Sequence, residues 1–155
     1  MNIDEIIGYV SGLDDGMLTL RPRAGDGTPE IAWGDAFFYY SPDGGVPANV
    51  QPFATIVTKD YPDDTSSRLD RPDAFRLNIS VSKDDFTRLL GHAPRDTGPA
   101  GDTGAADTVF AHPVYGTAGW VSIVNPGPRT DETARELLAA AYRTARSRYG
   151  NRAAR

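Results

Sequence analysis

Hydrophobic positions recur with two different spacings along the chain, and each spacing predicts its own kind of element. Apolar residues three or four apart predict an amphipathic helix over residues 3–11. Strict alternation over residues 75–81 predicts a half-buried strand instead. In that strand the polar positions Arg76, Asn78 and Ser80 are expected to face away from the core.

The same patterns, with the turn residues between them, predict the remaining elements. Strands are expected over residues 17–20, 30–41, 53–58, 108–110 and 119–124, the second interrupted by a bulge or turn at Gly34-Asp35. Ser82 and Thr130 are suited to cap two further helices, the last of which is expected to end near Tyr149, before Gly150. Residues 93–107 consist mainly of Gly, Pro, Ala and Asp, a composition that predicts a mobile loop prone to disorder.

This order of elements favours one α+β domain. Strands that follow one another through short turns predict an antiparallel sheet of five to six strands, with helices packed on one face as a two-layer sandwich. The domain is expected to span residues 1–150, with residues 151–155 as a short basic tail.

Composition narrows the classes of protein that remain. The 155 residues include no cysteine, which excludes disulfides and thiolate chemistry. The first residues lack the cationic start of a secretory signal, and no apolar run approaches the roughly 20 residues of a membrane helix. The chemistry of the chain therefore predicts a cytoplasmic protein without membrane contact.

Charge is unevenly distributed along the chain. The formal net charge is −5, yet residues 129–155 hold seven arginines and only three acids. An acidic body repels polyanions, which weighs against nucleic acid as the main partner, while the arginine-bearing last helix leaves such contact open. The alternative is a solvated helix face whose late arginines complement the helix dipole.

No cofactor or metal is expected from the motifs. The two histidines, His92 and His112, lack metal-binding spacing, and His92 suits a capping role behind a helix. The glycine pairs lack the lysine and helix of a phosphate-binding loop, and there is no GxSxG serine motif.

His112 opens the first candidate site. An imidazole, the phenol of Tyr115 and the indole of Trp120 are crowded near Gly116 and Gly119 between two predicted strands. Glycine at such points permits close approach of a ligand or of another backbone. Both a pocket and a structural turn are consistent with this pattern.

A second candidate lies in the long polar connection after the third strand. Lys59, Arg68 and Arg71 could clamp an anionic ligand, or could be held by internal ion pairs of Arg68 or Arg71 with Asp60 or Asp64.

The third candidate is the aromatic strand around Trp33, Phe37, Phe38, Tyr39 and Tyr40, which is core or a contact face. Asp35 stands among these apolar neighbours and is therefore a candidate for acid–base chemistry.

Several stretches also resemble a bacterial family catalogued as a domain of unknown function. They include TKDYPDDTSSRLDRP (residues 58–72) and HPVYGTAGW (residues 112–120), and the resemblance covers nearly the whole chain. More remotely, GWVSIV and the long last helix resemble the YjbR/MmcQ-like proteins, which implies a CyaY-like α+β fold and DNA binding as a guess for those proteins. Neither resemblance supplies functional residues.

Three functional hypotheses follow. The first is a non-enzymatic binding module for a small molecule or a protein partner, with His112, Tyr115 and Trp120 lining a pocket that Lys59, Arg68 and Arg71 complete. The second is a small enzyme that uses His112 as general acid or base with Asp35 or Tyr115 as partner. The third is nucleic-acid contact through the last helix. Assembly as a homodimer is also possible under each hypothesis. The first hypothesis requires the sheet to bring residues 59–71 and 112–120 to a common rim.

Overall fold

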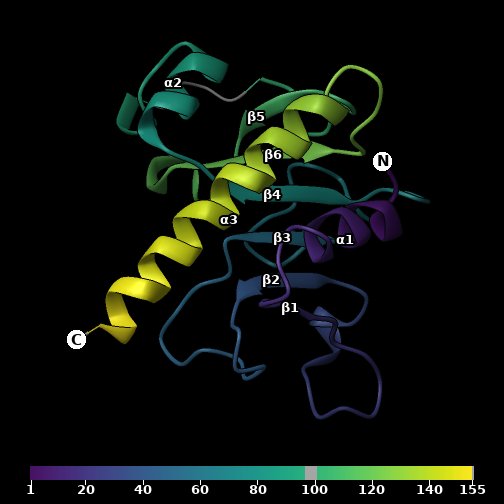
Figure 1. Ribbon diagram of the computed structural model, residues 1–155. Helices are drawn as coiled ribbons and strands as arrows, with labels where there is room; N and C mark the ends of the chain where they lie inside the picture. The colour runs from purple at the N-terminus through teal and green to yellow at the C-terminus, as the bar shows by residue number, and fades with distance from the viewer. Residues whose placement is uncertain (97–100, 155) are drawn as a thin grey trace.

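The computed structural model describes residues 1–96 and 101–154, and in them six strands form one antiparallel sheet (Figure 1). The strand order is β1-β2-β3-β4-β6-β5, so β4 and β6 lie side by side although α2 separates them in sequence. The strands are β1 (Met17–Leu20), β2 (Ala36–Tyr40), β3 (Ala54–Val57), β4 (Arg76–Ser80), β5 (Val109–Ala111) and β6 (Trp120–Val124). The helices are α1 (Ile3–Ser11), α2 (Lys83–Leu90) and α3 (Asp131–Ala153), with short 3₁₀ turns η1 (Glu30–Ala32), η2 (Pro94–Asp96) and η3 (Gly116–Ala118). The predicted α+β fold with an antiparallel sheet is confirmed.

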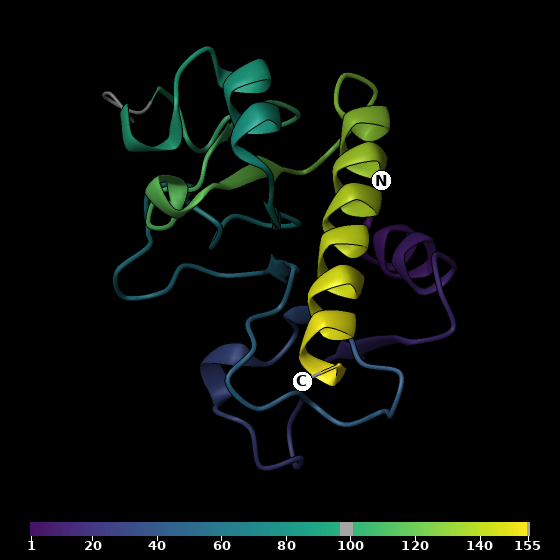
Figure 2. The same cartoon turned by 60° about the vertical axis from the view of Figure 1, so that its left-hand side comes forward.

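One face of the sheet carries the hydrophobic core. The long helix α3 runs diagonally across this face with α1 beside it (Figures 1 and 2). Alternation along the strands directs buried apolar side chains toward these helices, and burying each one contributes about 1.5–3 kcal/mol relative to exposure. The central members of the core are Phe38, Ile56, Leu77, Ile79, Val121 and Ile123 from the strands and Ile6, Val10, Phe86, Leu137 and Leu138 from the helices.

The opposite face of the sheet carries a row of polar side chains, of which those on β4 and β6 are buried and Thr55 is partly buried. Thr55, Asn78 and Ser122 lie opposite one another on neighbouring strands, and Arg76 lies two residues before Asn78 on the same face. Arg76 and Asn78 are each 1% exposed, so β4 is buried on both faces and the expected half-buried strand is wrong. The reason is that the long connections fold over this face and cover the polar row. Alternation within a strand does not predict where such connections fold.

Two predicted element ends also need correction. Residues 30–41 do not form one strand, because residues 30–32 make a 3₁₀ turn and Gly34 adopts a positive φ of 89° before β2 begins at Ala36. The helix α3 continues through Gly150 to Ala153, so Gly150 does not end it.

The predicted caps are confirmed for two helices and wrong for the third. Asn2 and Glu5 form a reciprocal capping box on α1, and Ser82 accepts from the backbone of Asp85 on α2. Thr130 precedes α3, but its side chain makes no capping bond. The Thr130 hydroxyl donates instead to Asp107, whose carboxylate also accepts hydrogen bonds from the backbone N–H groups of residues 127, 129 and 130 in the turn that leads into α3.

The glycine-rich segment 93–107 is only partly loop-like. Its residues 97–100, for which mobility is also predicted, lie outside the described part of the chain. Thr103 is 6% exposed, and Gly104 is also buried where it contacts the Arg68 side chain. The described end of this segment is therefore packed rather than free of contacts. Within residues 1–96 and 101–154, no helix combines the length and the apolar character required to cross a bilayer.

Candidate functional site

A cavity of about 480 Å³ lies on the sheet face that the helices leave uncovered. Strands β3 and β4 supply its floor with Thr55, Arg76 and Asn78. Its walls are mainly apolar and aromatic, and include Ile31, Phe37, Val57, Tyr61, Tyr115 and Trp120. We call this space the sheet-face cavity.

The guanidinium of Arg76 organises the floor of the sheet-face cavity. Its Nε donates to Asn78 Oδ1 at 2.8 Å, and its Nη1 donates to Asp64 Oδ1 and to Ser67 Oγ at 3.0 Å each. Its Nη2 donates to Asp64 Oδ2 at 2.5 Å and lies 3.2 Å from His112 Nε2. All five N–H groups of the guanidinium therefore have a group facing them, which fixes the side chain in one orientation.

Asp64 is the counter-ion of this buried cation. Burial by itself would raise the pKa of Asp64, but the hydrogen bonds and the charge of Arg76 outweigh burial and hold the pKa below its ordinary value. The carboxylate is therefore ionised at neutral pH and neutralises Arg76.

A second set of hydrogen bonds extends the network across the sheet. Asn78 Oδ1 also accepts from Ser122 Oγ at 2.7 Å, while Asn78 Nδ2 donates to Thr55 Oγ1 at 3.0 Å. Three adjacent strands are thereby linked through side chains as well as through their backbones. Among the described residues, every buried side-chain nitrogen or oxygen has a polar partner within hydrogen-bond distance, when the contact between Arg76 Nη2 and His112 Nε2 is counted as one.

His112 follows the end of β5 and turns its ring toward Arg76. Its Nδ1 accepts from the backbone N–H groups of Val114 and Tyr115, at 3.0 Å each. The centroid of the His112 ring lies 5.0 Å from the centroid of the Tyr115 ring. Burial, together with the charge of Arg76, lowers the pKa of His112 to about 4, although Asp64 acts in the opposite direction. The imidazole is therefore neutral at physiological pH.

The mouth of the sheet-face cavity is unusually apolar for a solvent-facing surface. Four large hydrophobic residues are more than a third exposed among those described, and three of them, Ile31, Val114 and Tyr115, line this cavity. They come from two segments far apart in sequence. A concentration of exposed apolar side chains around one opening is typical of a contact site.

The structure brings together some of the residues singled out from the sequence. His112, Tyr115 and Trp120 all line the sheet-face cavity, and residues 61, 63 and 64 of the long connection line it with them. The two segments thus share one rim.

The predicted cations of the long connection lie elsewhere. Lys59 donates to Asp35 at 3.0 Å and to the Trp33 carbonyl at 2.8 Å. Arg68 pairs with Asp102 at 3.3 Å, and Arg71 donates to the carbonyls of residues 67, 68 and 104. The expected ion pairs of Arg68 or Arg71 with Asp60 or Asp64 are therefore wrong, because these arginines attach the connection to residues 102–104 instead.

Asp35 is fully buried, but it is a structural hub beside the cavity rather than part of its lining. Its carboxylate accepts from the backbone and hydroxyl of Thr58, from Lys59 and from the Tyr61 hydroxyl. Burial and the hydrogen bond to this carboxylate raise the pKa of the Tyr61 phenol. The hub thereby positions Tyr61, whose ring lines the cavity wall.

Sequence reasoning missed Arg76, Asp64 and Asn78 as site residues. Arg76 and Asn78 occupy alternate positions of a strand, a pattern that ordinarily indicates a solvated face. One signal was available in the sequence: the chain has two long connections rich in polar residues, and these must lie against some surface of the sheet. A polar strand face is a suitable surface for them.

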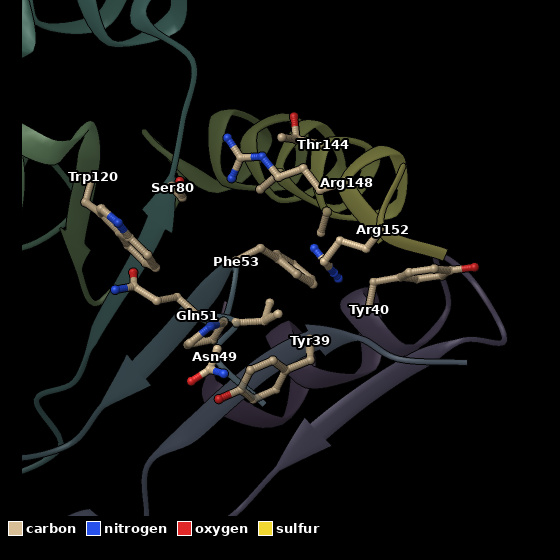
Figure 3. A pocket seen from close by; sticks show the side chains of 14 residues that line it. Tyr39, Tyr40, Asn49, Gln51, Phe53, Ser80, Trp120, Thr144, Arg148 and Arg152 are labelled. Atoms are coloured by element: carbon tan, nitrogen blue, oxygen red, sulfur yellow. The ribbon is translucent and has the colours of Figure 1, made fainter. Parts of the chain in front are cut away.

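A second, smaller cavity of about 360 Å³ adjoins the first near the C-terminal half of α3. Figure 3 shows Arg148 and Arg152 of the helix on one side and Tyr39 and Asn49 on the other. Gln51, Pro52 and Trp120 line both cavities and thus form a shared wall.

The sheet-face cavity combines a polar floor, whose groups are held by their own hydrogen bonds, with aromatic walls. Among the residues described, no group of three or more His, Asp or Glu side chains is placed to hold a metal ion.

Comparison with known proteins gives a family and a fold. Residues 1–154 match the family of unknown function DUF6194. No curated protein matches the sequence. A crystal structure of a protein from Pseudomonas syringae is similar in fold, with a TM-score of 0.52 at 15% sequence identity, over 94% of this chain and 99% of that one.

Proposed function

Because the chain belongs to the DUF6194 family, whose function is unknown, we propose from its geometry that it is a non-enzymatic binding module for a small molecule. The sheet-face cavity is the proposed site. One observation carries the proposal: exposed apolar side chains surround the mouth of a cavity whose polar floor is already fixed by its own hydrogen bonds.

The size and lining of the cavity fit this role. Small-molecule sites commonly measure about 300–1,000 Å³ and combine apolar walls with a few fixed polar groups. At about 480 Å³, the sheet-face cavity lies within that range. Phe37, Tyr115 and Trp120 provide flat surfaces against which a planar ligand could stack.

The rigidity of the floor also favours binding. Arg76 and Asn78 are held by several partners each, so a ligand would not have to order them on arrival. Binding to groups that are already oriented avoids an entropic cost of about 0.5–1.5 kcal/mol per side chain.

The same geometry favours binding over acid–base catalysis by His112. A pKa near 4 leaves the imidazole a weak base and unprotonated at neutral pH, and its Nδ1 is occupied by two backbone donors. Asp35, the suggested partner, is engaged by Lys59 and Tyr61 rather than by His112.

A fragment screen followed by two-dimensional ¹H–¹⁵N NMR tests the proposal. Bound fragments are expected to shift the backbone signals of residues 55, 76–78 and 112–120. The variant Val57→Trp should fill the cavity and weaken binding at least tenfold, because Val57 lines it. The matched control Leu18→Trp adds the same ring on β1, outside the cavity, and should leave binding unchanged. Fragments that bind equally well to both variants, or that shift signals elsewhere, would refute the proposed site.

A further inference from the structure

The hydrogen-bond donors around His112 outnumber what its ring can accept. Two backbone N–H groups, those of Val114 and Tyr115, point at Nδ1, and a guanidinium nitrogen of Arg76 lies 3.2 Å from Nε2. A neutral imidazole has only one bare nitrogen, and its other nitrogen carries a hydrogen. On one side of the ring, an N–H group of the imidazole therefore faces an N–H group of a neighbouring residue, with no acceptor for either.

The backbone decides which side that is. The two N–H groups at Nδ1 belong to the turn that follows β5 and cannot rotate away, so Nδ1 must be the bare nitrogen. Nε2 then carries the hydrogen and faces Arg76 Nη2, another donor. The second N–H of Nη2 is already used by Asp64 Oδ2 at 2.5 Å. Two N–H groups thus converge at the edge of the sheet-face cavity without an acceptor between them.

From this convergence we infer that the ligand of the sheet-face cavity presents an uncharged carbonyl oxygen to His112 Nε2 and Arg76 Nη2. This inference rests on the proposed binding function and specifies its ligand class. A carbonyl oxygen has two lone pairs and can accept from both N–H groups at once. Both residues line the cavity, so the ligand oxygen would approach this pair of donors from the cavity side.

The charges of the lining favour a neutral carbonyl group over a carboxylate. Arg76 is neutralised by Asp64, and Asp63 adds a second carboxylate at the rim. Asp63 is exposed, and no ion pair engages it among the described residues. An incoming carboxylate would therefore approach two acids and one cation that is already paired.

The walls complete the description of the ligand. Phe37, Tyr115 and Trp120 favour a flat ring, so an aromatic amide has the required combination of ring and carbonyl oxygen. Benzamide, benzoate and toluene form a matched series of probes, because they share the ring and differ in the polar group.

The first test reads the tautomer of His112 directly. Long-range ¹H–¹⁵N NMR of the ligand-free protein at pH 7 should show a bare Nδ1 and a protonated Nε2, with His92 as the internal comparison. Addition of benzamide should shift the Nε2–H signal. A bare Nε2 with a protonated Nδ1 would overturn the inference, whatever the fragment screen shows.

The second test compares the three probes by NMR titration. Benzamide should bind at least tenfold more tightly than either benzoate or toluene. Asp63→Asn removes a rim charge and should therefore reduce the affinity ratio of benzamide to benzoate about threefold. Asp15→Asn, the same change at an exposed site outside the cavity, should leave this ratio unchanged. Toluene binding as well as benzamide, benzoate binding more tightly, or none of the three binding would each overturn the carbonyl inference. The fragment screen with Val57→Trp decides the binding function separately.

Discussion

Arg76 and Asp64, twelve residues apart in the chain, form a two-pronged ion pair beneath the sheet-face cavity, with Nη1···Oδ1 and Nη2···Oδ2 separations of 3.0 and 2.5 Å. Arg76 is 1% exposed and the Asp64 side chain 12%. The pair joins a central strand to the long connection that covers it. It therefore holds the fold together at the same point where it forms the floor of the cavity.

Removing one member of this pair should cost more than removing both. Arg76→Met leaves Asp64 as a buried charge without its partner, so we expect a loss of about 3 kcal/mol in the free energy of unfolding. The double variant Arg76→Met/Asp64→Leu should recover much of this loss, because no unpaired charge remains. Denaturant unfolding of Arg76→Met, Asp64→Leu and the double variant gives the coupling free energy between the two side chains. Additive losses would show that the two side chains do not interact.

His112 should make stability depend on pH. Its pKa is about 4 in the folded protein, against roughly 6.5 for an unperturbed histidine. Between these values the unfolded chain binds a proton that the folded chain does not, so stability is complete above pH 6.5 and falls by about 3 kcal/mol as pH drops toward 4. Denaturant unfolding across this range measures the slope.

The slope attributed to His112 has a direct control. His112→Gln should flatten stability between pH 6.5 and 4, while His92→Gln removes the other histidine and should leave most of the slope. An unchanged slope in His112→Gln would contradict the assignment.

Tyr61 links the buried Asp35 to the cavity wall, and the two functions of its side chain can be separated. Tyr61→Phe removes the hydroxyl that donates to Asp35 and keeps the ring. A hydrogen bond to a charged group is worth about 1.5–3 kcal/mol, and we expect a loss of that size in unfolding experiments. Fragment affinity in the sheet-face cavity should change less than threefold, since the ring remains. A large loss of affinity with unchanged stability would reverse this assignment.

Asp107 fastens the turn that leads into α3. Its carboxylate accepts from the backbone N–H groups of residues 127, 129 and 130 and from the Thr130 hydroxyl at 2.6 Å. Asp107→Ala should therefore destabilise the protein by at least about 1 kcal/mol, because these hydrogen bonds are lost together. Asp73→Ala offers a comparison, because Asp73 also has a positive φ. A loss no larger than that of Asp73→Ala would mean that backbone strain, and not these hydrogen bonds, sets the stability at Asp107.

The sequence predicts the layers of this fold well because they follow from local pattern. The helix over residues 3–11 and the strand over residues 17–20 have the observed bounds, and the alternation in residues 75–81 identifies the core side of β4 correctly. Local turn chemistry also predicts the caps formed by Asn2 and Ser82.

The site is only half predictable, for a physical reason. The local sequence is enough to indicate His112, Tyr115 and Trp120 as candidates, because aromatic side chains and glycines lie close together there. The partner that fixes His112 is Arg76, which lies 36 positions earlier and resembles an ordinary solvated strand residue. Its burial depends on where the long connections fold, and alternation within one strand carries no information about that. The hydrogen bonds from Asp107 to the turn before α3 were not predictable for the same reason.

The wall shared by the two cavities gives the protein a built-in optical reporter. The chain has only two tryptophans, and Trp33 is anchored separately through its indole N–H to the Thr28 carbonyl at 3.2 Å. In a Trp33→Phe protein, the remaining indole at position 120 faces the space beside Arg148 as well as the space above Arg76. The fluorescence emission of Trp120 would change when a ligand occupies either cavity. A quencher that enters only one of the two cavities would show which of them is occupied.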